Sequence, residues 1–241
     1  MISIVCKNNF IDVIVQDRRA VQKKYRFFVN KRRGSVNIYT NDVKSGDEHH
    51  PNLDVEGVVC MFIFDMFRQE GLIRRLVVDT SKLTAINRKT ELDSRWSLFF
   101  LRMRETLSHL SACVPVSRFE VTGHPLLYGI EVDAFWISLV PGTLKAFVHK
   151  GKSTSSFRGS LNFLAATEQW KKAQQVSSEF FSGIEVEHFC NLENVTVRME
   201  QFSVNDFQRF ISKITCSDLF SSCDIKIQPT GAIANNWMSD L

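Results

Sequence analysis

The sequence predicts an α/β fold: an irregular, leucine-rich-repeat-like stack of strands and helices with a curved, largely parallel sheet and antiparallel strands at its N-terminal end. Two observations predict it. Residues 1–50 alternate apolar and polar positions in short runs separated by turn residues, which is typical of antiparallel strands. Residues 52–230 alternate helical and strand patterns, which favours parallel strands joined by crossover helices. We expect one domain over residues 1–241, of which 231–241 form a tail.

Short strands are expected throughout the antiparallel section. The apolar residues that define them are Ile2, Ile4 and Cys6; Ile11, Val13 and Val15; Phe27 and Val29; and Val36 and Ile38. Asn8 with Asn9, and Arg33 with Gly34, supply turn residues between these runs. The polar stretch NDVKSGDEHHPN, residues 41–52, is predicted to be a loop.

The helices of the second section are predicted from apolar spacing. Residues 53–70 are strongly apolar and stop at Gly71, a residue that suits the end of a helix. The next helix begins near Thr90 and ends before Pro115. Its apolar stripe is Leu92, Trp96, Phe99, Phe100, Met103, Leu107 and Leu110. Shorter helices are expected at 131–139 and 163–169.

The strands between these helices are expected at residues 72–79, 118–122, 143–149, 173–177 and 224–227. Their spacing is uneven, and the L-x-x-L-x-L-x-x-N signature of leucine-rich repeats is absent. A doubly wound sheet is therefore the alternative fold. Against this alternative, no predicted strand is followed by a glycine-rich phosphate loop.

The stretch LENVTVRMEQFSVNDFQRFISKI, residues 192–214, contains a complete strand, cap and helix. Val195, Val197 and Met199 alternate with polar residues, as in a strand with one buried face. Ser203 and Asp206 are placed as a capping box at the start of the helix. An inward-facing stripe is expected at Phe207, Phe210, Ile211 and Ile214.

Composition excludes a disordered chain, because 44% of the residues are hydrophobic and 11% are aromatic. Six scattered cysteines without a C-x-x-C pair indicate a reduced, intracellular protein, cytoplasmic or nuclear. The N-terminus does not resemble a signal peptide, and the longest apolar run, GVVCMFIF, is too short to span a bilayer. We therefore expect no membrane association.

The sequence nominates no catalytic residue, cofactor site or metal site, and we expect a protein that is not an enzyme. Phosphate-loop, dinucleotide-binding, zinc-protease and serine-hydrolase motifs are all absent. Asp47, Glu48, His49 and His50 have metal-ligand chemistry but are adjacent in a polar loop, which favours a solvated loop. His188 and Cys190 are two residues apart, a spacing at which helical side chains do not face each other.

A basic run within residues 18–33 is the candidate contact surface. Its proposed contact residues are Lys23, Lys24, Arg26, Lys31, Arg32 and Arg33. Basic residues interleaved with Tyr25, Phe27 and Phe28 suit RNA or single-stranded nucleic acid, in which bases stack and phosphates pair. The alternative is a charged strand edge that prevents aggregation, or a face that binds a protein.

The C-terminal part of the chain carries a family resemblance. TEQWKKAQQV, residues 167–176, and the segment EVEHFCNLENVTVRMEQFSVNDFQRFISKITCSDLFSSCDIKI that follows it resemble the FTH domain of nematode F-box proteins. The matching positions are Gln169, Trp170, Lys171, Ala173, His188, Phe189, Ser203, Asp206, Phe220 and Cys223. LVPGTLKAFVHKG resembles a turn and strand of that family, and the first 80 residues resemble its opening strands.

The resemblance implies a protein-interaction domain that selects the protein to be ubiquitinated by a cullin-based ubiquitin ligase. In such proteins an N-terminal F-box binds the Skp adaptor. No F-box pattern precedes Met1, so we expect a truncated or F-box-less member. The expected partners are a protein target that the sequence does not identify and, only if the full-length protein has an F-box, the Skp adaptor.

Overall fold

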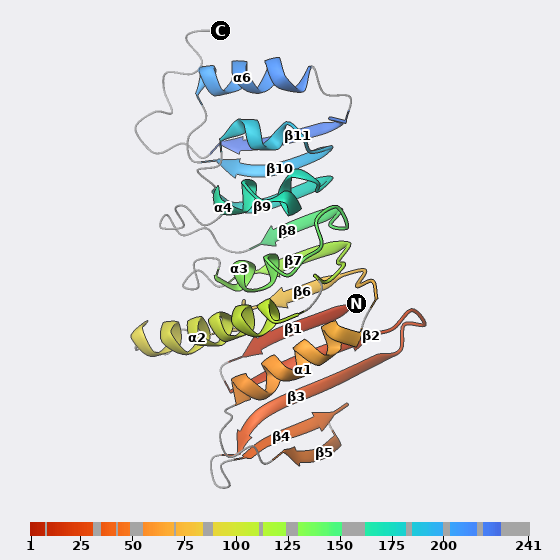
Figure 1. The fold of residues 1–241 in the computed structure, drawn as a ribbon. Helices are drawn as coiled ribbons and strands as arrows, with labels where there is room; N and C mark the ends of the chain where they lie inside the picture. Colours follow the sequence, from red (N-terminus) through yellow and green to blue (C-terminus); the bar gives the residue numbers. More distant parts are fainter. Residues whose placement is uncertain are drawn as a thin grey trace.

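The computed structural model describes residues 1–7, 9–30, 35–41, 43–48, 55–69, 71–83, 89–110, 113–123, 130–150, 162–181, 185–199, 203–215 and 219–227. The strands of this part form one 11-stranded sheet in the order β11-β10-β9-β8-β7-β6-β1-β2-β3-β4-β5. They are stacked one above another in an elongated column, with β5 at one end and helix α6 beyond β11 at the other (Figure 1).

The bounds of the strands are β1 Ile2–Lys7, β2 Phe10–Gln16, β3 Gln22–Asn30, β4 Ser35–Thr40, β5 Val43–Glu48, β6 Leu76–Asp79, β7 Arg118–Thr122, β8 Ala146–Lys150, β9 Gln175–Phe181, β10 Asn194–Met199 and β11 Ser222–Ile227. The bounds of the helices are α1 Val55–Gln69, α2 Lys89–Ser108, α3 Ile130–Trp136, α4 Asn162–Ala165, α5 Glu168–Lys171, the 3-10 helix η1 Val186–Phe189 and α6 Val204–Ile214.

The sheet is parallel over β1 and β6 to β11, and antiparallel from β1 through β5. The prediction of a largely parallel sheet with N-terminal antiparallel strands is therefore confirmed. From β6 to β11 the spatial order follows the chain without the reversal of a doubly wound sheet, so that alternative is wrong. The strands start at residues 76, 118, 146, 175, 194 and 222, which confirms the uneven spacing.

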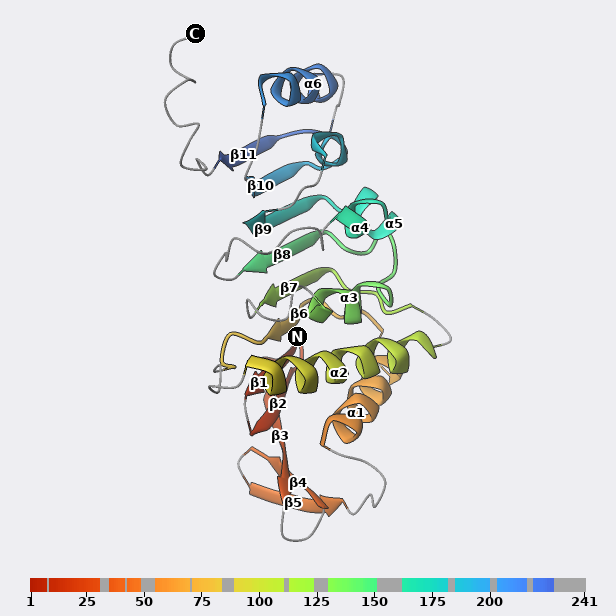
Figure 2. The same cartoon turned by 90° about the vertical axis from the view of Figure 1, so that its left-hand side faces the viewer.

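Helices α1 to α5 lie on the same side of the sheet (Figure 2). The strands bury their alternate residues against this layer, because successive side chains of a strand point to opposite faces. One buried row runs across the strands as Ile2, Leu76, Phe119, Phe147, Val176 and Val195. Trp96, Phe99 and Phe100 of α2 and Trp136 of α3 are fully buried and complete this core.

Three sequence predictions are corrected by the structure. The predicted loop 41–52 contains strand β5, which pairs with β4 although it lacks apolar alternation. The predicted helix 163–169 is two short helices, α4 and α5, separated by Thr167, whose hydroxyl caps α5. In the predicted inward stripe of α6, Phe210 is buried and Ile214 half-buried, but Phe207 and Ile211 are exposed at 51% and 38%, because α6 lies at the end of the stack with a neighbouring layer on one side only.

Candidate partner-binding surface

The face of the sheet opposite helices α1 to α5 is a regular surface that crosses all the described parallel strands. One row of residues crosses it from β1 through β6 to β11: Ser3, Val77, Glu120, Val148, Ser177, Thr196 and Asp224. Ser3, Glu120 and Val148 of this row are buried, whereas Thr196 and Asp224 are exposed, so the row is accessible mainly toward β11. None of the described helices α1 to α5 lies on this face, which we call the bare face, whereas parallel strands are usually covered by helices on both faces.

A charged cluster occupies the part of this face that β1, β2 and β3 form. Asp12 is buried and accepts hydrogen bonds from Nε and Nη2 of Arg26 at 2.7 and 3.2 Å. Lys7 donates to the same carboxylate at 3.4 Å. Both cations also lie over the ring of Phe10, at 4.4 Å for Arg26 and 4.7 Å for Lys7. Because Asp12 holds Arg26, this guanidinium is committed to the sheet.

A second ion cluster joins β6 to β7 on the same face. Glu120 accepts a hydrogen bond from Nη2 of Arg75 at 2.7 Å and a second one from Nε of Arg118. Burial favours the neutral carboxyl, but the two arginines outweigh it and lower the pKa of Glu120. The carboxylate is therefore ionised at neutral pH and fixes both arginines at the start of their strands.

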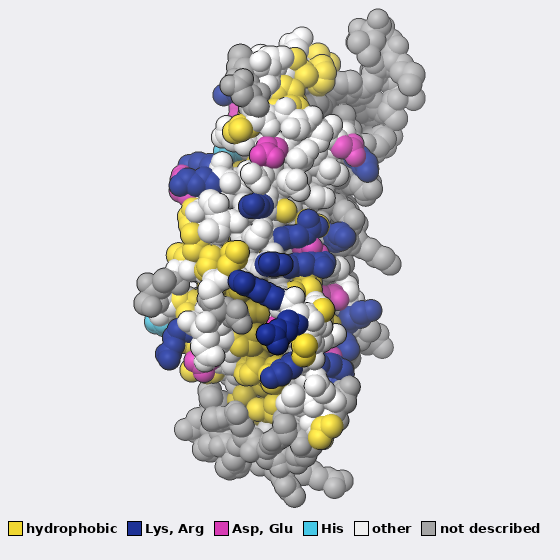
Figure 3. Space-filling model, turned by 90° about the vertical axis from the view of Figure 1, so that its right-hand side faces the viewer, with side chains coloured by type: hydrophobic (Ala, Val, Ile, Leu, Met, Phe, Trp, Pro, Cys, Tyr) yellow, Lys and Arg dark blue, Asp and Glu magenta, His cyan; other side chains and the backbone are white. Residues whose placement is uncertain are grey.

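Cations recur where the parallel strands begin. Figure 3 shows this side of the molecule, on which Lys and Arg side chains gather along the middle. The residues are Arg18 and Arg19 in the β2–β3 turn, Arg74 and Arg75 before β6, Arg118 at the start of β7, Lys145 before β8 and Lys172 before β9. All seven are exposed, and we call this set the basic edge.

The acidic residues at the basic edge are already engaged. Asp17 accepts hydrogen bonds from the backbone N–H groups of Arg19 and Val21 at 2.7 and 3.0 Å. Glu120 binds Arg75 and Arg118, and Glu168 binds Lys171 and Lys172. Among the described residues, Arg18, Arg19, Arg74 and Lys145 have no ion-pair partner, so the basic edge keeps an excess of positive charge.

The structure distributes the predicted contact residues over two faces. Lys23 points to the helix side of β3, with Tyr25 and Phe27, whereas Lys24 and Arg26 point to the bare face. Lys31, Arg32 and Arg33 lie outside the described residues. Their contact with a partner stays a prediction.

Local sequence patterns did not reveal Arg74, Arg118 and Lys145, which come together only through strand pairing. The available signal was a cation at or just before the predicted strands.

The residues that carry the family resemblance hold successive layers together. Trp170 is buried, donates from its indole Nε1 to the carbonyl of His188 at 2.9 Å, and lies 6.1 Å from the ring of Phe189. Gln169 donates from its amide to the carbonyl of Leu139 at 3.0 Å. Trp136 donates in the same way to the hydroxyl of Thr167 at 2.9 Å. These contacts give the motif residues Gln169 and Trp170 a structural role.

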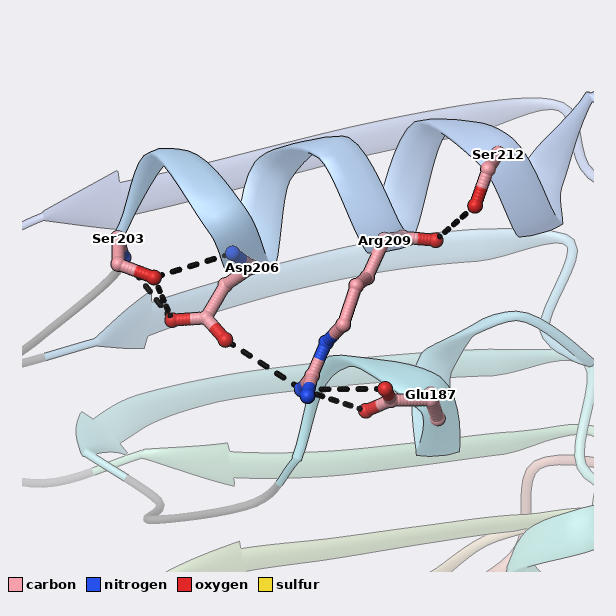
Figure 4. Close-up of polar contacts among 5 residues, drawn as sticks. All are labelled: Glu187, Ser203, Asp206, Arg209 and Ser212. Atoms are coloured by element: carbon pink, nitrogen blue, oxygen red, sulfur yellow. Dashed lines mark hydrogen bonds and ion pairs between the residues drawn. The ribbon is translucent and has the colours of Figure 1, made fainter.

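Helix α6 is attached by a second set of such contacts (Figure 4). Ser203 and Asp206 form the predicted capping box, and hydrogen bonds from Ser203 lower the pKa of Asp206. Arg209 reaches from α6 to Glu187 of η1 at 3.1 Å. Phe210 and Phe220 pack edge to face at 5.8 Å. The predicted cap is therefore confirmed, and it fixes the end of the stack.

Burial shifts the pKa values of several titratable groups in the described interior. Burial lowers the pKa of His149 to about 3 and raises the pKa of Cys223 to about 11. Burial also raises the pKa values of Cys6 and Cys190, so these thiols stay protonated.

Within the described residues, no three His, Cys, Asp or Glu side chains are placed to share a metal ion. None of the described helices combines the length and apolarity needed to cross a membrane.

Comparison with known proteins adds one finding. A family model, that of the FTH domain, matches residues 99–236, which is more than half of the chain. The match contains β7 to β11 and the Trp170, His188 and Phe189 contacts described above. No curated protein and no solved structure matches the chain.

Proposed function

Because this chain belongs to the FTH domain family, which is associated with the F-box, we propose that it is a non-enzymatic protein-interaction domain. Its task is to bind a protein on the bare face of the sheet. The family match covers β7 to β11, the strands that contribute most of this face.

One observation carries the proposal: seven parallel strands of the described sheet are covered by helices on one side only. A parallel sheet normally buries both faces. The bare face is stiff, since its strands are tied by backbone ladders, with one register shift between Val197 and Arg198, and its charged side chains are fixed by ion pairs. A stiff surface binds with little loss of conformational freedom, which favours affinity.

In finer detail, we propose that the stack works like the strand layer of a leucine-rich repeat and that the bound protein is a target for ubiquitination. The link to a ligase would be the Skp adaptor, bound through an F-box in the full-length protein. On this proposal the domain supplies selectivity and acts inside the cell.

Affinity purification with mass spectrometry tests the proposal when it is run on the chain and on two matched variants. Gln175→Arg with Thr196→Arg places two long cations on exposed positions of the bare face. Gln208→Arg with Thr215→Arg makes the same chemical change at exposed positions of α6 and its C-cap. We expect the first variant to lose specific partners and the second to keep them.

Retention of every partner by the bare-face variant, with circular dichroism showing both variants folded, would refute this location. A second arm fuses an F-box to the N-terminus. The proposal predicts that only the fusion co-purifies the Skp adaptor, so adaptor capture by the unfused chain would contradict that part.

A further inference from the structure

We propose that the basic edge binds an acidic, extended segment of the protein partner, with one carboxylate seated between Arg18 and Arg74. This inference rests on the proposed protein-binding function and specifies its recognition chemistry. It starts from a feature that neither the family match nor the bare sheet face explains, namely unpaired arginines that line a hollow.

The hollow is an open cleft of about 490 Å³ between the β2–β3 turn and the segment that leads into β6. Arg18, Ala20 and Asp17 line one side, and Gly71, Leu72 and Arg74 line the other. Asp17 is occupied by two backbone N–H groups of its own turn, at 2.7 and 3.0 Å. The two guanidinium groups therefore have no competing ion pair among the described residues, and the cleft is suited to a carboxylate.

The rest of the basic edge extends the cleft in one direction. From Arg74, the cations continue across the starts of β6, β7 and β8: Arg75 and Arg118 share Glu120, and Lys145 has no ion-pair partner among the described residues. Neighbouring strands are about 4.8 Å apart, and alternate side chains of an extended peptide recur about every 7 Å. Long Lys and Arg side chains can span this difference, so an extended peptide crossing the strand starts presents its acidic residues to successive cations.

The surroundings favour a peptide over a nucleic acid. The large apolar side chains exposed beside the cleft are aliphatic, Val21 at 54% and Leu72 at 52%, and they suit aliphatic side chains of a peptide. Single-stranded nucleic acid binds where exposed aromatic rings stack on its bases.

The test uses selection from a random dodecapeptide display library on the folded full chain. A selected peptide is then synthesised with a fluorescein label, and binding is followed by fluorescence anisotropy. The edge variant is Arg18→Glu with Arg74→Glu. The matched control is Lys82→Glu with Lys150→Glu, which makes the same change in net charge at exposed positions where parallel strands end.

We expect the selected peptides to be enriched in Asp and Glu. The edge variant should weaken the labelled peptide at least tenfold, and the control variant less than twofold. A peptide with its acids changed to amides should lose as much affinity as the edge variant does. A labelled oligo-uridine probe is measured in parallel, and we expect it to bind weakly and equally to both variants.

Selected peptides without acidic enrichment, or equal affinities of the two variants, would overturn the inference while leaving the proposed function intact. Oligo-uridine binding that only the edge variant loses, without any acidic peptide selected, would assign the edge to nucleic acid and also overturn it. If no peptide is selected and the affinity purification yields no partner, both proposals fail together.

Discussion

Replacing Trp170 by Phe tests whether the family motif works by satisfying the half-buried carbonyl of His188. The side chain of Trp170 is 1% exposed, and its indole N–H donates to the carbonyl of His188 at 2.9 Å. Phenylalanine keeps an aromatic ring but removes the donor. A buried acceptor left without its partner costs about 1–3 kcal/mol, in addition to the packing lost with the smaller ring.

Trp96 provides the matched control within the same chain. It is fully buried like Trp170, but its Nε1 meets no hydrogen-bond acceptor among the described residues. Trp96→Phe therefore breaks no hydrogen bond to a described acceptor: it loses ring packing, including part of the contact with Arg95, and removes a buried donor that has no acceptor. We expect Trp170→Phe to lower the free energy of unfolding by about 1–3 kcal/mol more than Trp96→Phe does. For a chain of this length, each kcal/mol corresponds to a fall in Tm of about 2–4 °C.

The assay is equilibrium unfolding in urea followed by circular dichroism at 222 nm, because tryptophan fluorescence changes with the substitution itself. Trp136→Phe, which removes a donor 2.9 Å from the Thr167 hydroxyl, should cost less than Trp170→Phe, because this hydroxyl keeps its hydrogen bonds with Leu164 and Trp170. Equal losses for Trp170→Phe and Trp96→Phe would refute the reasoning, since the hydrogen bond to His188 would then contribute nothing measurable.

Four further predictions follow from single sites. Ser203→Ala should cost about 1 kcal/mol and speed hydrogen exchange in the first turn of α6 only; unchanged exchange there would contradict the capping box. Glu120→Gln should cost about 1 kcal/mol at pH 7. The folded pKa of Glu120 lies below its ordinary value of 4.5, so the ionised carboxylate stabilises the fold above pH 4.5. This stabilisation is lost as the pH falls through the folded pKa, so the free energies of unfolding of the variant and the parent should converge in acid. Gly123→Ala should destabilise by about 1–3 kcal/mol, because the new Cβ would lie 2.7 Å from Oε1 of Glu131; thermal unfolding at the parent's Tm would show the space to be larger than described. Burial lowers the pKa of His149 to about 3, so below pH 6.5 the unfolded chain takes up a proton on this residue while the folded chain does not. The free energy of unfolding should therefore fall by about 1.4 kcal/mol per pH unit between pH 6.5 and pH 3. His149→Phe should remove this contribution to the pH dependence, which urea unfolding at pH 7, 6 and 5 would measure.

The elements that the sequence predicted well are those with their own local signals. The strand and helix of residues 194–214 were recognisable because Val195 and Val197 alternate and because Ser203 and Asp206 form a cap. Such signals act over a few residues and do not depend on the rest of the chain.

The elements that were missed depend on partners distant in the sequence. Strand β5, residues Val43–Glu48, has a polar sequence and exists through its backbone pairing with β4. The two-residue period of β3 divides the predicted contact residues, so that Lys23 lies on one face and Lys24 on the other. The side covered by helices was also not predictable, because apolar alternation defines a buried face without stating what covers it.

The candidate site was harder to predict than the fold for the same reason. A run of basic residues in one hairpin is visible in the sequence, whereas Arg74, Arg118 and Lys145 are separated by long stretches of chain. The parallel register places them together at the edge of the sheet where the parallel strands begin. Only the strand order makes this convergence visible, since each of these cations alone resembles an ordinary surface residue.

Photo-crosslinking in cells tests the central claim most directly. A benzophenone amino acid is placed at Thr196 on the bare face of the sheet or at Gln208 on α6, both exposed positions in the same region of the stack. Binding through the bare face predicts a reproducible protein adduct from position 196 that is absent from position 208. Adducts that form only from position 208 would show that the partner binds the helical side, and the account would be wrong.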